Sequence, residues 1–243
     1  MKRMLTLLSL LLLCATSTQA QVNLYVGDCG AGTTTHSVTN ACLTNSGTAF
    51  TAFGSILVPS TPRIGFIGAM SVVDVQSSQA ALPAWWDGAV CRAAGFALAS
   101  DATMGGNCPT LWDAAPPAGN NITAQPGIGG PNRVRFLLGV VLDIGSAYDL
   151  VGDDVTETSV FKWSVLKSRS VGTGACAGCS CGATIVLTEV NLQTLTDTPA
   201  TFVRLTYPIT NNTITYNGGS MVGCGASTPT QNRTWGSIKS LYR

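Results

Sequence analysis

Apolar and polar residues alternate along several short stretches of the chain. Residues 161–165 (Phe-Lys-Trp-Ser-Val) and 203–207 (Val-Arg-Leu-Thr-Tyr) carry an apolar side chain at every second position. Successive side chains of a β-strand point to opposite faces, so a period of two is typical of a strand with one buried face. Each stretch therefore predicts a half-buried strand.

Other stretches are apolar on both faces or rich in β-branched residues. Residues 52–58, 64–75 and 134–142 contain few polar positions, which is typical of strands in the middle of a sandwich. Residues 184–192 are rich in Val, Ile and Thr and predict a further strand. Residues 213–216, followed by Asn-Gly-Gly, predict a short strand that ends in a turn.

Helical patterns are scarce, with a short helix predicted at residues 83–87 and one amphipathic turn around Trp235 and Leu241. The many short strands predict an all-β fold, a two-sheet antiparallel β-sandwich. We expect this sandwich to occupy residues 21–171. Residues 172–243 are expected to add the final strand or strands and a short disulfide-linked C-terminal appendage.

The first twenty residues have the three parts of a secretory signal peptide. Lys2 and Arg3 supply positive charge, residues 5–13 are almost entirely apolar, and residues 18–20 (Thr-Gln-Ala) end in a small residue, as signal peptidase requires. The apolar run is shorter than the roughly 20 residues that span a bilayer. We therefore expect residues 1–20 to be removed, leaving a secreted or cell-surface protein without a membrane span.

Charge excludes one class of partner. Charged residues make up 10% of the chain, against about 25% in average globular proteins. The sequence has no basic patch that could follow a phosphate backbone, so nucleic-acid binding has no electrostatic support.

Eight of the nine cysteines lie after the signal peptide. An even number of cysteines in an exported chain predicts disulfides. Proximity in sequence favours two bridges, Cys29 with Cys42 and Cys91 with Cys108. Each would close a loop of about a dozen residues, for which the chain-entropy model gives about 3 kcal/mol.

The other four cysteines are Cys176, Cys179, Cys181 and Cys224. A bridge between Cys179 and Cys181 would strain disulfide geometry, so Cys176 is predicted to bond one of them while the other reaches Cys224. A four-thiolate zinc site is the alternative, because Cys176 and Cys179 have the spacing that such sites use. Oxidation outside the cell favours the disulfides.

Three tryptophans, Trp85, Trp86 and Trp112, lie in or beside the loop that a Cys91–Cys108 bridge would close. Exposed indole rings can stack on the apolar faces of sugars, which would make a carbohydrate-binding or adhesive surface. The alternative is that the rings cap one end of the sandwich core, where large aromatic residues are usually found.

One acidic cluster stands out, formed by Asp149, Asp153, Asp154 and Glu157. Carboxylate oxygens in an exported β-protein are ligands that Ca²⁺ prefers. The spacing does not match an EF-hand, and a polar loop between two strands explains the cluster equally well. Calcium is the one cofactor that the sequence suggests.

Catalytic machinery is hard to assemble from this sequence. His36 is the only histidine, and no Gly-x-Ser-x-Gly elbow accompanies it. A secreted hydrolase would have to use aspartates, with Asp74, Asp87, Asp113 and Asp143 as candidates, but no spacing favours a pair. We therefore expect no catalytic activity.

The order of features from residue 50 to 192 includes the pair Trp85-Trp86, the strand at 161–165 and the ending Ile-Val-Leu-Thr-Glu-Val-Asn-Leu. This order resembles the cohesin and carbohydrate-binding-module type of sandwich, which is immunoglobulin-like. Residues 174–179 and the terminal segment 228–243, with its Thr-Trp-Gly-Ser-Ile-Lys-Ser-Leu-Tyr-Arg ending, resemble a group of exported proteins of environmental bacteria. The resemblance implies architecture and export, and it assigns no catalytic residues.

The function expected from the sequence is a structural or recognition role outside the cell. A carbohydrate-binding or adhesive module built on the three tryptophans is the first alternative, and a secreted hydrolase is the second. An extracellular glycan or a surface protein is the expected partner.

Overall fold

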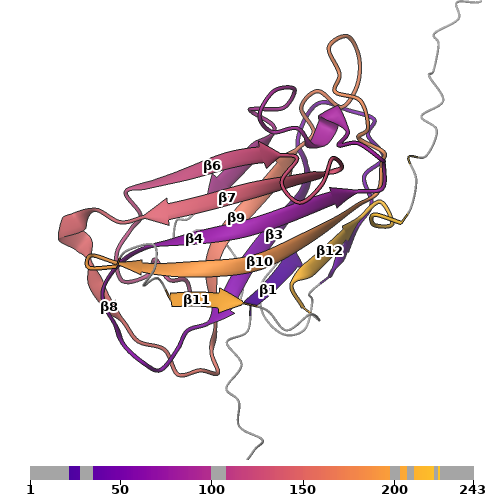
Figure 1. The fold of residues 1–243 in the computed structure, drawn as a ribbon. Helices are drawn as coiled ribbons and strands as arrows, with labels where there is room; N and C mark the ends of the chain where they lie inside the picture. Colours follow the sequence, from indigo (N-terminus) through magenta and orange to yellow (C-terminus); the bar gives the residue numbers. More distant parts are fainter. Residues whose placement is uncertain are drawn as a thin grey trace, which may run out of the picture.

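A computed structural model describes residues 22–27, 35–99, 108–197, 203–206, 211–221 and 224. Nearly all of the regular structure in these residues is β (Figure 1). The strands are β1 Val22–Val26, β2 Ser37–Val38, β3 Thr48–Leu57, β4 Arg63–Ser77, β5 Phe96–Ala99, β6 Gly119–Pro126, β7 Arg133–Val141, β8 Tyr148–Leu150, β9 Glu157–Leu166, β10 Ala183–Thr194, β11 Val203–Thr206 and β12 Thr213–Tyr216. Two short 3₁₀ helices, η1 Ala84–Trp86 and η2 Ile144–Ser146, interrupt them.

The strands form two sheets, which confirms the predicted two-sheet antiparallel sandwich. The smaller sheet has the order β1-β3-β9-β5, and the larger sheet has the order β2-β12-β10-β4-β7-β6, with β8 pairing to β4 and β11 to β10. Strand pairs are antiparallel except for β12 with β2. The segments predicted to be central are central: β3 lies between β1 and β9, and β4 between β10 and β7.

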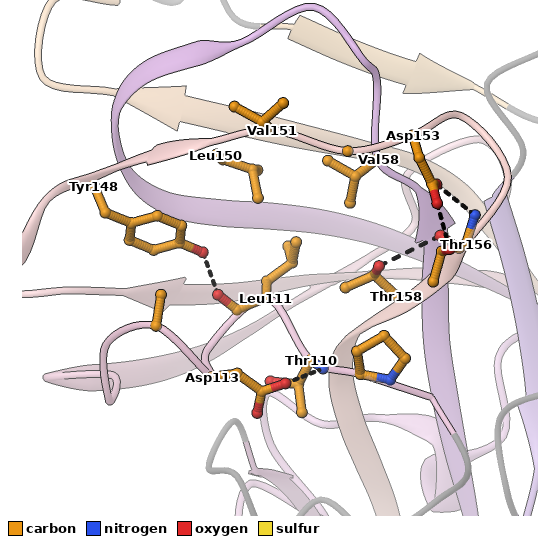
Figure 2. Close-up of a pocket in the computed structure, with 13 residues that line it drawn as sticks. Val58, Thr110, Leu111, Asp113, Tyr148, Leu150, Val151, Asp153, Thr156 and Thr158 are labelled. Atoms are coloured by element: carbon orange, nitrogen blue, oxygen red, sulfur yellow. Dashed lines mark hydrogen bonds between the residues drawn. The ribbon is translucent and has the colours of Figure 1, made fainter.

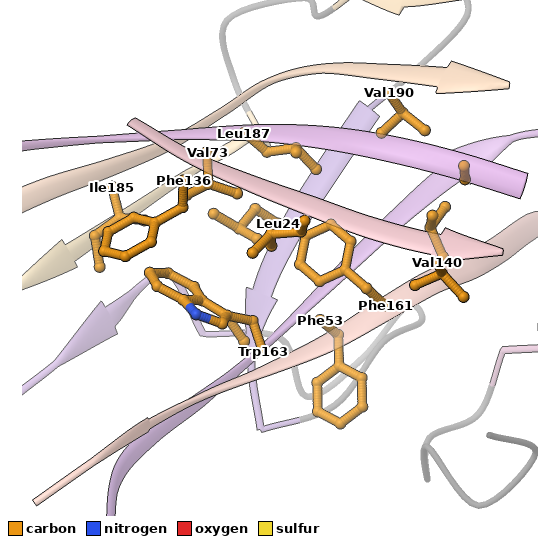
Figure 3. Packing of buried hydrophobic residues seen from close by; sticks show 14 of the residues in the cluster. Leu24, Phe53, Val73, Phe136, Val140, Phe161, Trp163, Ile185, Leu187 and Val190 are labelled. Carbon is orange, nitrogen blue, oxygen red and sulfur yellow. The ribbon is translucent and has the colours of Figure 1, made fainter. Parts of the chain in front are cut away.

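Alternation along β9 is what the sequence predicts. Phe161, Trp163 and Val165 are buried, whereas Lys162 and Ser164 are only half-buried. The inward residues meet those of the larger sheet, and the ring of Phe136 lies 5.2 Å from that of Trp163 (Figure 3). Burial of this layer supplies most of the driving force for folding.

Antiparallel pairing sorts the loops into two opposite ends of the sandwich (Figure 1). We call one the disulfide end, made of residues 39–47, 78–95, 167–182 and 217–221. We call the other the groove end, made of residues 58–62, 109–118 and 142–156. Strand β9 runs from the groove end to the disulfide end, and β10 runs from the disulfide end back to the groove end.

Three disulfides meet in the loop between β9 and β10. Cys179 bonds Cys42, Cys176 bonds Cys91, and Cys181 bonds Cys224. The first two bridges join segments 137 and 85 residues apart in the chain. Each of the three cysteines of the loop therefore holds a different part of the protein.

The predicted bridges are mostly wrong. Cys42 does not bond Cys29, Cys91 does not bond Cys108, and Cys176 bonds neither Cys179 nor Cys181. Cys108 is also disulfide-bonded, and Cys29 lies outside the described residues. Only the expectation that one of Cys179 and Cys181 reaches Cys224 is confirmed. Proximity in sequence failed because the sheets bring distant loops to the same end.

The same bonds contradict the zinc alternative, because disulfide sulfurs are not thiolate ligands. They fit an oxidising environment, as expected of an exported protein. Within the residues that the structure describes, no helix is long and apolar enough to cross a membrane. The predicted signal peptide and the amphipathic turn near Trp235 lie outside these residues.

Candidate functional site

A groove with a volume of about 430 Å³ opens at the groove end (Figure 2). Its lining comes from the loop after residue 108, from β8, the connection to β9 and the start of β9, and from Val58: Pro109, Thr110, Leu111, Asp113, Ala114, Tyr148, Leu150, Val151, Gly152, Asp153, Thr156 and Thr158. Sites for small molecules usually measure about 300–1,000 Å³ and combine apolar walls with a few polar groups. The groove has this character, since buried Leu111 and Leu150 lie beneath exposed carboxylates.

One wall of the groove extends the smaller sheet. The backbone N–H of Leu111 donates to the carbonyl of Ser159 at 3.0 Å, and the N–H of Ser159 donates to the carbonyl of Pro109 at 2.8 Å. The indole N–H of Trp112 donates to the carbonyl of Val160 at 2.8 Å. The Trp112 ring is buried, so it anchors this wall to β9 from beneath.

The opposite wall is the connection from β8 to β9. The N–H of Gly152 donates to Pro59 and that of Asp154 donates to Val58, at 3.0 and 3.2 Å. A Cβ on Gly152 would overlap the carbonyl of Val58, so this close approach requires glycine. Asp154 has φ +60°, a left-handed conformation that aspartate tolerates better than most residues.

Tyr148 ties the two walls together. Its hydroxyl donates to the carbonyl of Leu111 (Figure 2). Its ring packs edge-on against that of Phe66, with centroids 5.4 Å apart. Burial, with a smaller contribution from the charge of Asp113, raises the pKa of Tyr148 to about 12. The phenol therefore stays protonated and keeps its hydrogen bond through the neutral pH range.

Two exposed carboxylates lie at the rim, and backbone amides hold both. Asp113 accepts a hydrogen bond from the N–H of Thr110 at 3.0 Å. Asp153 accepts from the hydroxyl of Thr156 at 2.6 Å and from the N–H groups of Thr156 and Val155 at 2.7 and 3.0 Å. These bonds, led by the one from the Thr156 hydroxyl, lower the pKa of Asp153 to about 2.

The structure does not bring the four predicted calcium ligands together. Only Asp153 of the four predicted ligands lines the groove. Asp149 accepts a hydrogen bond from the backbone of Gly65 in β4, and Asp154 accepts one from the backbone of Ser60 in the preceding loop. Glu157 accepts from side chains of β1 and β3. No group of three or more His, Cys, Asp or Glu residues able to hold a metal occurs in the described part of the chain.

The predicted stacking platform is also wrong, because Trp85, Trp86 and Trp112 are at most 2% exposed. Trp85 stacks on Tyr216 with ring centroids 5.3 Å apart and meets Trp86 edge-on at 4.9 Å. These two rings fill the disulfide end, while Trp112 lies at the other end. Stacking on a sugar needs an exposed ring face, and none of the three offers one.

The other catalytic candidates are scattered. Asp74 pairs with Arg135 on the outer face of the larger sheet, and Asp87 caps a turn at the disulfide end. Asp113 and Asp143 belong to different loops of the groove end, and only Asp113 lines the groove. The ring of His36 bonds the carbonyl of Thr213 at 3.1 Å.

The sequence suggested both rim carboxylates but in different hypotheses, Asp153 as a calcium ligand and Asp113 as one of four candidate carboxylates of a hydrolase. Their separation of forty positions gives no local pattern. The available signal was the turn chemistry at each site, an Asp with a threonine three positions away, which indicates a carboxylate held by a tight turn.

The fold and groove define a disulfide-bonded, two-sheet antiparallel β-sandwich with a surface groove at one end. Comparison of the chain with protein-family models, with curated proteins and with solved structures found no match.

Proposed function

We propose that this protein is an exported recognition module without catalytic activity, and that the groove is its binding site. The groove itself carries the proposal, because it combines a cavity of ligand size with carboxylates held in fixed positions. Groups fixed before binding lose little conformational entropy when a ligand arrives.

The state of Asp153 favours recognition over acid–base catalysis. A general acid or base works best with a pKa near the working pH, and Asp153 has a pKa of about 2. At neutral pH it is a permanent negative charge and a weak base. Such a group attracts and orients a partner rather than moving a proton.

The disulfides support export. Bridges that join such distant parts of the chain form and persist in oxidising compartments. By closing long loops they restrict the unfolded chain, which stabilises a module that works outside the reach of chaperones.

A binding screen with a blocked groove tests this function. Secreted protein is immobilised and exposed to panels of glycans, peptides and surface proteins, and turnover of each compound is measured in parallel. Ala114 is exposed and lines the groove, so Ala114→Trp should fill it and abolish binding. Ala118 is exposed nearby without lining the groove, so Ala118→Trp should bind normally.

Two results would contradict the proposal. Turnover of any panel compound that Ala114→Trp abolishes would make the protein an enzyme. Binding that survives Ala114→Trp would place recognition elsewhere on the molecule.

A further inference from the structure

The charges at the groove end are almost all negative. Asp113 and Asp153 line the groove, and no lysine, arginine or histidine is among the described residues that line it. Asp143, Asp149 and Asp154 belong to the same end. A concave surface lined by charge of one sign concentrates partners of the opposite sign.

Basic residues lie elsewhere. Arg63 is the first residue of β4 and lies next to the groove end, but its guanidinium is already paired with the carboxylate of Asp197 at 2.5 Å. Lys167 and Arg169 belong to the disulfide end, which the strands separate from the groove. The negative charge around the groove is therefore not neutralised locally within the described residues.

Asp113 has capacity for a further partner. A carboxylate offers about four acceptor positions. Among the described residues, the carboxylate of Asp113 accepts one hydrogen bond, from the N–H of Thr110. That bond fixes the Asp113 carboxylate at the exposed rim. The remaining lone pairs of the carboxylate can therefore accept hydrogen bonds from a ligand. Charge-assisted hydrogen bonds to carboxylates are about twice as strong as neutral ones.

Beneath the rim the groove is aliphatic. Val58, Leu111 and Leu150 are each at most 7% exposed and form its apolar lining. Arginine and lysine side chains pack their methylene stems on apolar surface while the charged head reaches a polar group. A floor of this kind beneath an acidic rim matches a long cationic side chain.

We propose that the groove binds an arginine or lysine side chain presented by an extended peptide or protein partner. The stem lies on Val58, Leu111 and Leu150, and the cationic head bonds the carboxylate of Asp113. The negative field of Asp153 steers the approach. This assignment rests on the proposed recognition function and names the chemistry of its ligand.

Matched peptides test the inference on the unaltered protein. The ¹⁵N-labelled protein is titrated with acetyl-Leu-Arg-Leu-amide and with acetyl-Leu-citrulline-Leu-amide, which has nearly the same shape but no charge. We expect the arginine peptide to shift the amide signals of Thr110, Val151 and Thr156. The citrulline peptide should bind at least about tenfold more weakly, which corresponds to about 1.4 kcal/mol.

Two carboxylate variants add a control. Asp113→Asn should weaken binding of the arginine peptide at least about fivefold. Asp87 also accepts hydrogen bonds from backbone amides, but it lies at the disulfide end, so Asp87→Asn should leave binding unchanged. Raising the salt concentration from about 0.05 to 0.5 M should weaken the peptide further, because salt screens exposed charges.

Equal affinity for the arginine and citrulline peptides would overturn the inference, as would shifts confined to the disulfide end. If a neutral glycan or peptide from the screen binds and Ala114→Trp abolishes it, while the arginine peptide does not bind, the inference fails but the recognition function stands. If neither the panel nor the peptide binds, both fail.

Discussion

Arg92 is a buried cation whose removal should cost a large part of the stability of the fold. Its residue is 1% exposed, and its guanidinium donates to the carbonyl oxygens of Trp85, Gly95 and Leu166. The guanidinium carbon also lies 3.9 Å from the centroid of the Trp85 ring. It lies 5.1 Å from the centroid of the Phe96 ring as well, so three carbonyls and two aromatic rings surround the cation.

The hydrogen bonds and the cation–π contact of Arg92 outweigh the cost of burying its charge. Burial lowers the pKa of Arg92 from 12.5 to about 10, which corresponds to about 3 kcal/mol against the charged form. Three hydrogen bonds from a charged donor contribute about 1.5–3 kcal/mol each, and a buried cation–π contact contributes about 2 kcal/mol. After about 1.5–2 kcal/mol for the entropy of fixing the side chain, a net stabilisation of about 2–6 kcal/mol remains, centred near 4 kcal/mol.

Urea unfolding followed by tryptophan fluorescence, without reductant, measures this. Arg92→Met should lower the free energy of unfolding by about 3–5 kcal/mol, because three carbonyls lose their donor. Arg92→Lys should lose about 2 kcal/mol, since an ammonium keeps the charge but not the planar fork. Exposed Arg169 is the control, and Arg169→Met should change stability by less than about 0.5 kcal/mol. A change that small for Arg92→Met would refute the reasoning.

Three further predictions concern other parts of the fold. The pKa of Asp153 is lowered to about 2, so its stabilisation is complete above the unfolded value of about 4 and is lost as the pH falls toward 2. The melting temperatures of wild type and Asp153→Asn should therefore differ at pH 7 and converge at pH 2. Replacing Cys91 and Cys176 together by alanine should cost about 2–4 kcal/mol in urea unfolding, because this bridge closes a loop of 85 residues; an unchanged midpoint would contradict it. Gly54→Ala should cost about 1–3 kcal/mol by the same assay, because its Cβ would overlap the ring of Phe161, and a neutral effect would mean that the ring can move aside.

The strands could be predicted because their signal is local. The alternation in β9 and the apolar runs of β4 and β7 need only neighbouring residues, and the structure places all three as the pattern indicates. Burial of one face against the opposite sheet then follows from the period of two. The all-β fold class could be predicted for the same reason.

Disulfide pairing could not be predicted, because it depends on the order of strands in the sheets. Cys42 precedes β3 and Cys179 precedes β10, two strands that belong to different sheets. Their loops meet only because both strands have one end at the disulfide end. Loop-closure entropy favours near neighbours in sequence, and the geometry of the folded sheets overrides that preference.

The tryptophans show how a residue type can support two opposite hypotheses. A sequence cannot tell whether Trp85 is exposed, and its flat ring suits a sugar as well as a core. The contacts of Trp85 in the structure show that it belongs to the core. Its ring stacks on Tyr216 and lies within cation–π distance of Arg92, and its indole N–H donates to the hydroxyl of Ser170 at 3.0 Å. A buried indole with its N–H satisfied stabilises the fold and is closed to ligands.

The two ends of the sandwich therefore depend on different forces. Covalent bonds and the stacked aromatic core hold the disulfide end. At the groove end, the hydrogen bond that Tyr148 donates and the bonds that the rim carboxylates accept fix the loops. A reductant should act first at the disulfide end, whereas acid should release the hydrogen bonds of Asp153 at the groove only as the pH falls toward 2. Since binding in our proposal needs the charge of the rim, acid should weaken the arginine peptide at a pH where the disulfides are intact. Where circular dichroism shows that the fold persists at that pH, loss of binding without loss of structure separates the role of the charge from that of the scaffold.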